Sequence, residues 1–402
     1  MHHTIMRDAV VVGSGNFDHL ECFNEHPNMS TRAYSIFTSF EMQPPQPGFD
    51  PATCRRNSLC RPLATAFSSN QPQENTDKEM AAAQALKSST QALYRYVGGV
   101  YLNIGYLEQS VLSALSYEPL DGDLFIASYP KCGTTWTQLI VLSILDERPA
   151  PTSFTESTSR SPHLEFTGAE GARAMPRPGA IKTHLPFHRV PYSAKAKYIY
   201  VTRNPYDCCV SCYYHTKTFL SIIFDGTFDE FFEIFVDGKV DYGDYFAHLL
   251  SWYKRRSDSN VLFLTYEDLK RDLRGSVLKI ADFIDKQQYG DKLRKQPELL
   301  SKVLDSVSLD AMKKVNTQFE EWCTKMANVP LEALPEEMRS RMEIVKEFLP
   351  KPGTTDFVRK GIVGDWKNHF SSEQITKMKD VIAVKTAGSD VMDLWKDTDI
   401  PR

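Results

Sequence analysis

One short segment of the chain combines the groups that an anion-binding loop needs. Residues 129–136 read Tyr-Pro-Lys-Cys-Gly-Thr-Thr-Trp. Gly133 lets a ligand approach the backbone closely, and Lys131 supplies a mobile positive charge. The hydroxyls of Thr134 and Thr135 are additional donors. We predict that this segment, called the cradle below, binds a phosphate-type group.

The order of residues in the cradle differs from that in nucleotide triphosphatases. In those loops the lysine follows a glycine, and another glycine stands five places before that one. Here Lys131 precedes Gly133, and residue 128 is a serine. ATP hydrolysis is therefore not indicated, and a small-molecule kinase is disfavoured.

Two later segments carry cationic groups of the same kind. Arg203 lies in the sequence Thr-Arg-Asn-Pro and offers a planar fork that suits a phosphate. Residues 359–367 read Arg-Lys-Gly-Ile-Val-Gly-Asp-Trp-Lys, in which the glycines allow a tight loop that presents charge and backbone amides together. Three separate regions of the sequence thus carry phosphate-type groups.

Short apolar runs and helical patterns alternate along the chain and must position these segments. The strands are expected at 124–127, 180–183, 198–201 and 261–264, and helices at 136–145 and from near Asp207 and Glu267 onward. This alternation predicts an α/β fold with a central parallel sheet flanked by helices. In such a sheet, ligands bind at the carboxyl ends of the strands. A loop between a strand and a helix also presents free amides and the helix dipole to an anion, as the cradle would.

The composition excludes several classes of function. With 402 residues, 42% hydrophobic and 24% charged, the chain can bury a core. Its formal charge of -4 argues against a nucleic-acid partner. The apolar stretch 139–145 is far shorter than the roughly 20 residues of a membrane-spanning helix, and residues 1–12 lack a signal-peptide pattern. We expect a cytoplasmic protein without a membrane partner.

The eight cysteines are expected to be reduced thiols. They have neither the density nor the short-chain context of a disulfide scaffold. Cys208, Cys209 and Cys212 lie close in sequence, but no matching Cys or His pair completes a set of four ligands. No metal site is predicted.

The first 80 residues are expected to be a disordered extension. Pro44, Pro45, Pro47 and Pro51 interrupt any regular element there. Residues 13–15, Gly-Ser-Gly, imitate a dinucleotide loop without its third glycine, so we attribute them to chance. Residues 93–402 are expected to form a single domain.

The cationic segments together resemble the cytosolic sulfotransferases, whose fold is similar to that of P-loop nucleotide triphosphatases. The resemblance runs from about residue 93 to the end of the chain. In that family the cradle holds the 5′-phosphosulfate of 3′-phosphoadenosine 5′-phosphosulfate (PAPS), an Arg and a Ser hold its 3′-phosphate, and Arg-Lys-Gly closes over that phosphate. A Trp and a Tyr lie at the adenine, and the product is adenosine 3′,5′-bisphosphate (PAP). The resemblance implies as cofactor-binding residues Lys131, Cys132, Gly133, Thr134, Thr135, Trp136, Arg203, Ser211, Tyr266, Arg359, Lys360 and Gly361.

The sequence offers groups for each part of a sulfuryl transfer. His184 follows a predicted strand and carries an imidazole, a group whose ordinary pKa lies near neutrality. It matches the catalytic histidine of the family in Lys-Thr-His-Leu-Pro, so we assign it as general base. Lys131 would stabilise charge on the leaving phosphate, and Lys182 would add positive potential beside it. The resemblance also implies that Ser211 restrains Lys131 until an acceptor arrives. The scheme requires no metal.

The acceptor is expected to be a phenol, a catecholamine-like amine or a steroid alcohol. Lys182 and His184 would lie beside it, together with His163, which stands where the family usually has an aromatic residue. Tyr213 and Tyr214 are further candidates for this side of the site.

Three questions stay open on the sequence. Leu309 replaces an aromatic residue expected to stack on adenine, and Val307 replaces a hydroxyl residue, which keeps a catalytically silent PAPS- or PAP-binding protein as an alternative. A carbohydrate sulfotransferase is a second alternative. The family's dimer motif is degraded at 367–372, so a monomer or a weak homodimer is expected.

Overall fold

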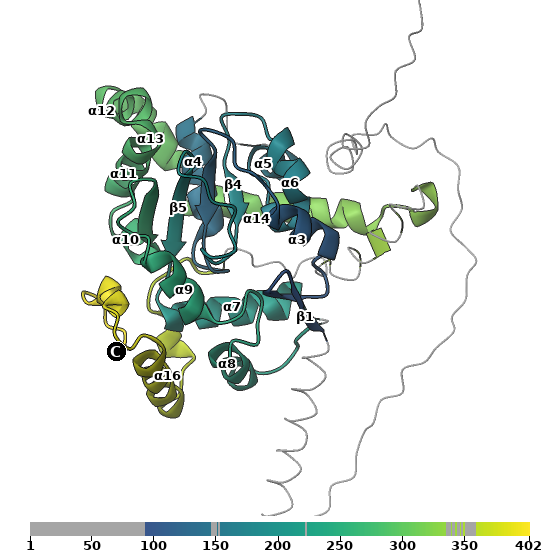
Figure 1. Ribbon diagram of the computed structural model, residues 1–402, viewed down its shortest axis with the longest axis vertical. Helices are drawn as coiled ribbons and strands as arrows, with labels where there is room; N and C mark the ends of the chain where they lie inside the picture. Colours follow the sequence, from purple (N-terminus) through teal and green to yellow (C-terminus); the bar gives the residue numbers. More distant parts are fainter. Residues whose placement is uncertain are drawn as a thin grey trace, which may run out of the picture.

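A parallel sheet runs through the centre of the molecule (Figure 1). The structure, a computed structural model, describes residues 93–402 apart from 146–150, 152, 222, 335–338, 340–341, 344–345, 347–348 and 350–358. The sheet consists of β3 (Leu124–Ala127), β4 (Ile181–Thr183), β5 (Lys197–Thr202) and β6 (Val261–Thr265). These strands lie where the sequence predicted them. The expected extension at 1–80 lies outside the described residues.

The order of the strands creates a switch point at their carboxyl ends, and the region beside this point is called the crevice below. The sheet is ordered β4-β3-β5-β6, and all three pairings are parallel. The chain leaves β3 toward β4 on one side, whereas it leaves β5 toward β6 on the other. Adjacent strands with diverging connections mark the switch point where ligands of open α/β sheets bind. The loops after β3 and β5 flank this point, and they contain the cradle and Arg203.

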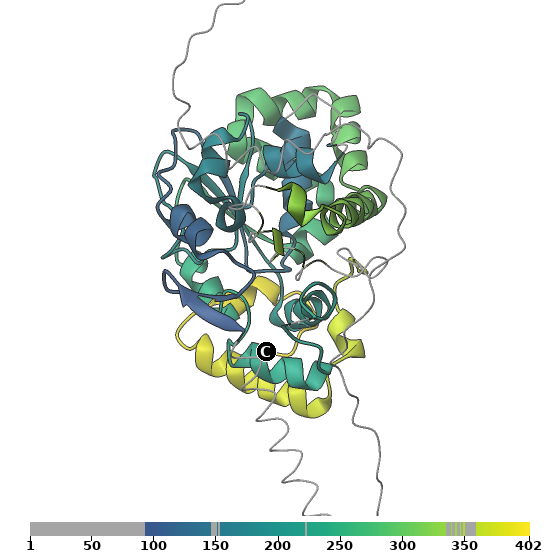
Figure 2. The ribbon, with the colours of Figure 1, turned by 90° about the vertical axis from the view of Figure 1, so that its right-hand side faces the viewer.

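Helices cover both faces of the sheet and continue beyond it. The described helices are α3 (Glu108–Leu115), α4 (Thr134–Leu145), α5 (Phe154–Arg160), α6 (Leu164–Ala174), α7 (Pro205–Phe219), α8 (Phe228–Val236), α9 (Tyr245–Tyr253), α10 (Tyr266–Arg271), α11 (Leu273–Asp285), α12 (Asp291–Lys295), α13 (Pro297–Ser306), α14 (Leu309–Ala327) and α16 (Ser372–Lys385), with short turns η1 (Lys286–Gly290), η2 (Leu331–Ala333), η3 (Asp365–Asn368) and η4 (Val391–Trp395). Figure 2 shows α16 and the C-terminal residues, in yellow, at the opposite end of the molecule from the green helices α11–α13.

The core divides at the sheet because successive strand residues point to opposite faces. Phe125 and Tyr198 stack at 4.9 Å within the larger cluster, which also receives α7, α8 and α9. Ile126 and Ile199 face the second cluster, which is formed with α4, α11 and α13. Both faces are buried, as expected for a parallel sheet.

A hairpin that the sequence reading missed precedes the first helix. It pairs β1 (Tyr94–Val97) with β2 (Val100–Asn103), and Gly98 and Gly99 both have positive φ, of 55° and 78°. Two glycines between apolar runs are a hairpin signal. The hairpin holds the loop before α9, because the Asp241 carboxylate accepts from the Asn103 backbone N–H at 2.9 Å and from its amide at 2.8 Å.

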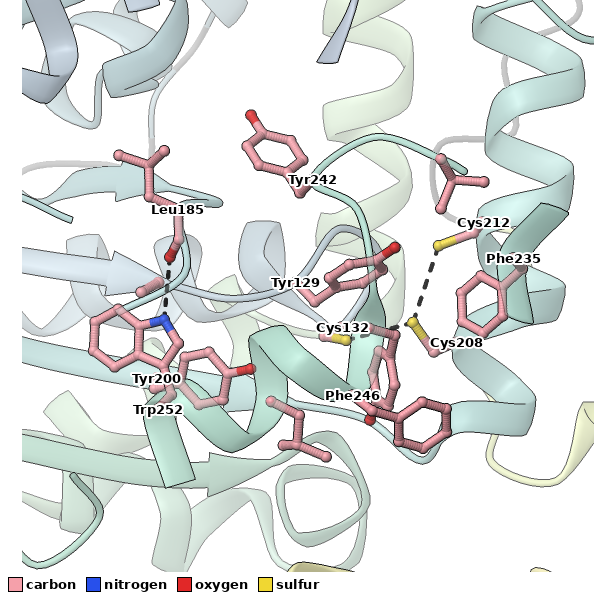
Figure 3. Close-up of a cluster of buried hydrophobic side chains, with 14 of the residues drawn as sticks. Tyr129, Cys132, Leu185, Tyr200, Cys208, Cys212, Phe235, Tyr242, Phe246 and Trp252 are labelled. Carbon is pink, nitrogen blue, oxygen red and sulfur yellow. Dashed lines mark hydrogen bonds between the residues drawn. The ribbon is translucent and has the colours of Figure 1, made fainter. Parts of the chain in front are cut away.

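Three thiols lie where the cradle meets α7, one from the cradle and two from the helix (Figure 3). The Cys132 Sγ is 3.7 Å from the Cys208 Sγ, which is 4.0 Å from the Cys212 Sγ. All three are buried free thiols, and burial raises the pKa of Cys208 well above its usual value. They therefore pack the cradle against α7 as small apolar groups.

None of the described helices has the length and apolar character needed to cross a membrane.

Candidate active site

The cradle is a tight loop between β3 and α4. Lys131 adopts a φ of 67° and Gly133 a φ of 104°, so the backbone turns twice through the left-handed region before Thr134 begins the helix. A Cβ at Gly133 would lie 2.9 Å from the Tyr266 ring. The Tyr129 hydroxyl donates to the Gly243 carbonyl at 2.9 Å. The sharp turn exposes the first amides of α4 to a ligand, as an anion site requires.

Arg203 stands across the crevice, after β5. Its guanidinium is 4.5 Å from the centre of the Tyr266 ring and donates to the Ile362 carbonyl at 2.8 Å. Only 8% of the residue is exposed, and within the described part of the chain its Nε has no hydrogen-bond partner. A buried guanidinium with a free donor suits a phosphate oxygen.

The two predicted adenine residues lie together. The rings of Trp136 and Tyr266 are 5.6 Å apart, and the Trp136 indole donates to the Val307 carbonyl at 2.8 Å. A Cβ at Gly361 would lie 3.3 Å from the Leu309 side chain and 3.8 Å from the Tyr266 hydroxyl. The backbone of Val307 thus orients Trp136, and Leu309 lies at the same end of the crevice.

Residues 359–367, called the closing segment below, are attached to α7. The Asp207 carboxylate accepts from the backbone N–H groups of Gly364 at 2.8 Å and Trp366 at 3.0 Å. Arg359 and Lys360 both pair with the buried Asp365. These contacts, with Arg203 bonded to Ile362, bring the third cationic segment against the second.

His184 is held by its backbone on both sides. Its N–H donates to the Glu165 carboxylate at 2.6 Å, and its carbonyl is 3.0 Å from the His248 Nε2. The other nitrogen of His248 is 3.1 Å from the Tyr200 hydroxyl. The position of His184 is therefore fixed by side chains from α6, α9 and β5.

The His184 ring faces the start of the cradle. Its Nδ1 lies 2.9 Å from the Ser128 carbonyl oxygen and 3.2 Å from the Ser128 hydroxyl. A carbonyl only accepts, so the shorter contact favours a hydrogen on Nδ1 and a lone pair on Nε2. The Ser128 hydroxyl is also 2.5 Å from the Thr134 hydroxyl. A chain of hydrogen bonds thus links His184 to the cradle.

The site combines clustered positive charges with a neutral imidazole. Burial lowers the pKa of Lys131 to about 8, and the positive charges of Lys182 and Arg203 act in the same direction. Burial also lowers the pKa of Lys182 to about 8. Burial, Lys182 and His163 hold the pKa of His184 well below its usual value, so the ring is an unprotonated base at neutral pH. Clustered, partly buried cations are stabilised by an anion between them.

A family model described as the sulfotransferase domain matches residues 121–390. The chain belongs to this family. The chain is 33% identical over 321 residues to sulfotransferase 1C2 of Rattus norvegicus, which covers 76% of this chain and 97% of the relative. It is 32% identical over 274 residues to the amine sulfotransferase of Oryctolagus cuniculus, which covers 67% of this chain and 82% of the relative.

Solved structures show the same fold. Mouse sulfotransferase SULT7A1 complexed with PAP matches with a TM-score of 0.54 and 26% identity, over 76% of this chain and 98% of that chain. Retinol dehydratase in a complex with retinol and PAP matches with a TM-score of 0.53 and 23% identity, over 77% of this chain and 95% of that chain. The expected α/β fold with a central parallel sheet is therefore confirmed.

The rings nearest to His184 in this sulfotransferase come from outside the sheet. His163 lies 5.1 Å and Tyr242 5.3 Å from the His184 ring, measured between ring centres. The Glu165 carboxylate is fully buried, with one oxygen 3.6 Å from the His163 Nε2. His163 and Tyr106 lie edge-to-face at 6.5 Å. This side of His184 is aromatic, with one buried carboxylate behind it.

Two of the tyrosines on α7, Tyr213 and Tyr214, were predicted for the acceptor side, and the structure shows what their rings contact. Tyr213 packs against Phe228 and Phe231 of α8, with ring centres 5.5 Å and 5.7 Å apart. The guanidinium of Arg359 lies 4.6 Å above the Tyr214 ring. Tyr214 thus supports the closing segment, and Tyr213 packs between helices. Ser211 is half-buried on the same helix.

Sequence reading missed several residues that shape the site. Ser128, Glu165, Tyr242 and His248 all contact or face His184, yet each lies in a different part of the chain. Tyr242 carries a local signal in the sequence, the glycine that follows it, and the structure gives it a φ of 67°. Among the described residues, no group of three His, Cys, Asp or Glu side chains is placed to hold a metal ion.

Proposed function

We propose that this sulfotransferase transfers the sulfuryl group of PAPS to a hydroxyl or amine of a small organic acceptor, with His184 as general base. One observation carries the proposal: three cations from separate elements act on one another, and one of them, Lys182, acts on a neutral imidazole. Lys131 and Lys182 each have a pKa of about 8, and the buried Arg203 has an Nε without a hydrogen-bond partner among the described residues. This donor set fits a molecule with a phosphate at each end better than an uncharged ligand.

The chain's own residues divide into groups that would hold the two ends of PAPS. The phosphosulfate would bind at the cradle, the 3′-phosphate at Arg203 and the closing segment, and the adenine beside Trp136 and Tyr266. When bound, PAPS supplies the sulfuryl group and a stable leaving phosphate. The proposed cofactor residues are Lys131, Cys132, Gly133, Thr134, Thr135, Trp136, Arg203, Ser211, Tyr266, Arg359, Lys360 and Gly361.

His184 would remove the acceptor's proton at Nε2. The Ser128 carbonyl at 2.9 Å from Nδ1 favours the tautomer with a lone pair on Nε2. Burial and Lys182 keep the ring uncharged, so the base is ready at neutral pH. Lys131 and Lys182 would stabilise the negative charge that develops on the leaving phosphate.

The relatives support the general reaction and a small acceptor. A structure of mouse sulfotransferase SULT7A1 contains PAP, and the rabbit relative is named for amines. His163, beside His184, adds a polar group to the acceptor side, which favours acceptors with a second hydrogen-bonding group. A cytoplasmic location and a monomer or weak homodimer stay predictions from the sequence.

Two measurements test the proposal. Calorimetry with PAP on the wild type and on Arg203→Ala should give much weaker binding for the variant, and equal affinity would remove the 3′-phosphate assignment. Radiolabelled PAPS, offered with phenols, catecholamine-like amines, steroid alcohols and an oligosaccharide, should give product with the small acceptors. His184→Ala should lower turnover by about 10²–10⁴-fold while PAP affinity is kept. Full turnover in this variant would refute the assignment of His184 as general base.

One observation supports a second candidate function, that of a catalytically silent PAP-binding protein. Leu309, where the family has an aromatic residue, is 45% exposed and lies at the adenine end of the crevice. An aliphatic side chain stacks less strongly on a base than an aromatic ring. A protein that binds PAP but transfers sulfate to no member of the panel would be a silent binding protein.

A further inference from the structure

A single serine hydroxyl lies between the proposed base and the proposed phosphosulfate loop. Ser128 follows β3 directly and is completely buried. Its hydroxyl is 2.5 Å from that of Thr134 and 3.2 Å from the His184 Nδ1, while its carbonyl oxygen is 2.9 Å from the same nitrogen. The three residues form one hydrogen-bonded chain whose ends are the cradle and the imidazole.

The hydrogens in this chain can be arranged in two ways. Each hydroxyl has one hydrogen, and at 2.5 Å one of Ser128 and Thr134 must donate to the other. If Thr134 donates to Ser128, the Ser128 hydrogen is free to go to Nδ1 of His184. This donation competes with the contact between Nδ1 and the Ser128 carbonyl at 2.9 Å. Where the hydroxyl donates, the imidazole hydrogen sits on Nε2, and the base has no lone pair where the acceptor would lie.

The opposite arrangement prepares the base. If Thr134 gives its hydrogen to an anion in the cradle, Ser128 must donate to Thr134. The Ser128 hydroxyl and carbonyl then both only accept from His184, which places the imidazole hydrogen on Nδ1 and the lone pair on Nε2. An anion at Thr134 therefore selects the productive tautomer.

We propose that Ser128 is a positioning residue that couples occupancy of the cradle to the tautomer of His184. The inference rests on the proposed function, because it requires an anion that accepts from Thr134. Glu165 and His248 fix the backbone of His184, so the ring does not have to move for the switch. Binding of PAPS before the acceptor would then be the productive order.

Nitrogen-15 NMR of histidine-labelled protein tests the proposal without turnover. The chain has 10 histidines, and the His184 signals are assigned by their absence in His184→Gln. The two ring nitrogens report which one carries the hydrogen. Saturating PAP should raise the ratio of the Nδ1–H to the Nε2–H tautomer by about fivefold, the change expected from redirecting one hydrogen bond.

Two variants isolate the hydroxyl. In Ser128→Ala the tautomer ratio should be the same with and without PAP, whereas Ser128→Thr, which keeps the hydroxyl, should restore the response. Thr134→Val breaks the other end of the chain and should also abolish it. Thermal melting and PAP calorimetry on each variant confirm that it is folded and loaded.

Different failures have different meanings. If calorimetry detects no PAP binding to the wild type, the proposed function fails and the inference with it. If PAP binds but the tautomer ratio of His184 stays constant, the inference alone is overturned. An equal PAP response in the wild type and in Ser128→Ala would likewise overturn it.

Discussion

Raising the pH should weaken PAP binding far below the titration range of ordinary lysines. Lys131 and Lys182 each have a pKa of about 8, whereas an exposed lysine titrates near 10.4. With this pKa, about nine in ten side chains are charged at pH 7 and about one in ten at pH 9. Because the charged form attracts phosphate, affinity is present below pH 8 and is lost as the pH rises through it. Each lysine therefore contributes about a tenfold loss of PAP affinity between pH 7 and pH 9.

The combined loss between pH 7 and pH 9 is expected to lie between about 10-fold and 100-fold. The titrations of the two lysines are coupled, because the positive charge of Lys182 lowers the pKa of Lys131. When Lys182 becomes neutral, the pKa of Lys131 rises, so the two losses do not simply multiply. Calorimetry with PAP at constant ionic strength measures the dependence of PAP affinity on pH, and the phosphates of PAP are already about nine-tenths ionised at pH 7. Lys131→Met should reduce the dependence of PAP affinity on pH. The control Lys195→Met removes an exposed lysine paired with Asp121 and should leave that dependence unchanged. An affinity that stays constant from pH 7 to pH 9 would refute the electrostatic reasoning.

Three further substitutions probe the geometry of the site. Gly133→Ala should lose PAP binding and about 1–3 kcal/mol of unfolding free energy by denaturant titration, since φ is 104° and the new Cβ meets the Tyr266 ring at 2.9 Å. Gly388→Ala, with φ of 77° and open space, is the control for backbone cost alone. Asp207→Ala removes the acceptor of two closing-segment amides at 2.8 and 3.0 Å and should weaken PAP by about tenfold. His163→Phe should shift kcat/KM from catechols toward simple phenols by roughly tenfold at unchanged PAP affinity, and an unchanged acceptor ratio would contradict a role in specificity.

The elements around the crevice could be predicted because their signals are local. The strand at 124–127 was predicted to the residue, and the others to within one or two. The cradle and Arg203 follow strand ends, and parallel strands bring such ends to one edge. The hairpin at 94–103 was missed although its two glycines mark the turn.

The surroundings of His184 could not be predicted in the same way. Ser128, Glu165 and His248 reach it from residues 56, 19 and 64 positions away along the chain. Nothing in their local sequence distinguishes a hydrogen bond to this histidine from one to solvent. Tyr214 illustrates the reverse case, because its helix position allowed an acceptor role while its ring contacts Arg359.

The two sides of the proposed site come from different parts of the fold. Two of the segments proposed to bind the donor, the cradle and Arg203, follow neighbouring strand ends, whereas His163 and Tyr242, which flank the imidazole, come from the start of α6 and from the loop held by the β1–β2 hairpin. Mutation in these outlying pieces can change the alcohols or amines that fit without disturbing how the donor is held. Exchanging these peripheral segments between sulfotransferases is therefore a route to a new acceptor preference with the same donor.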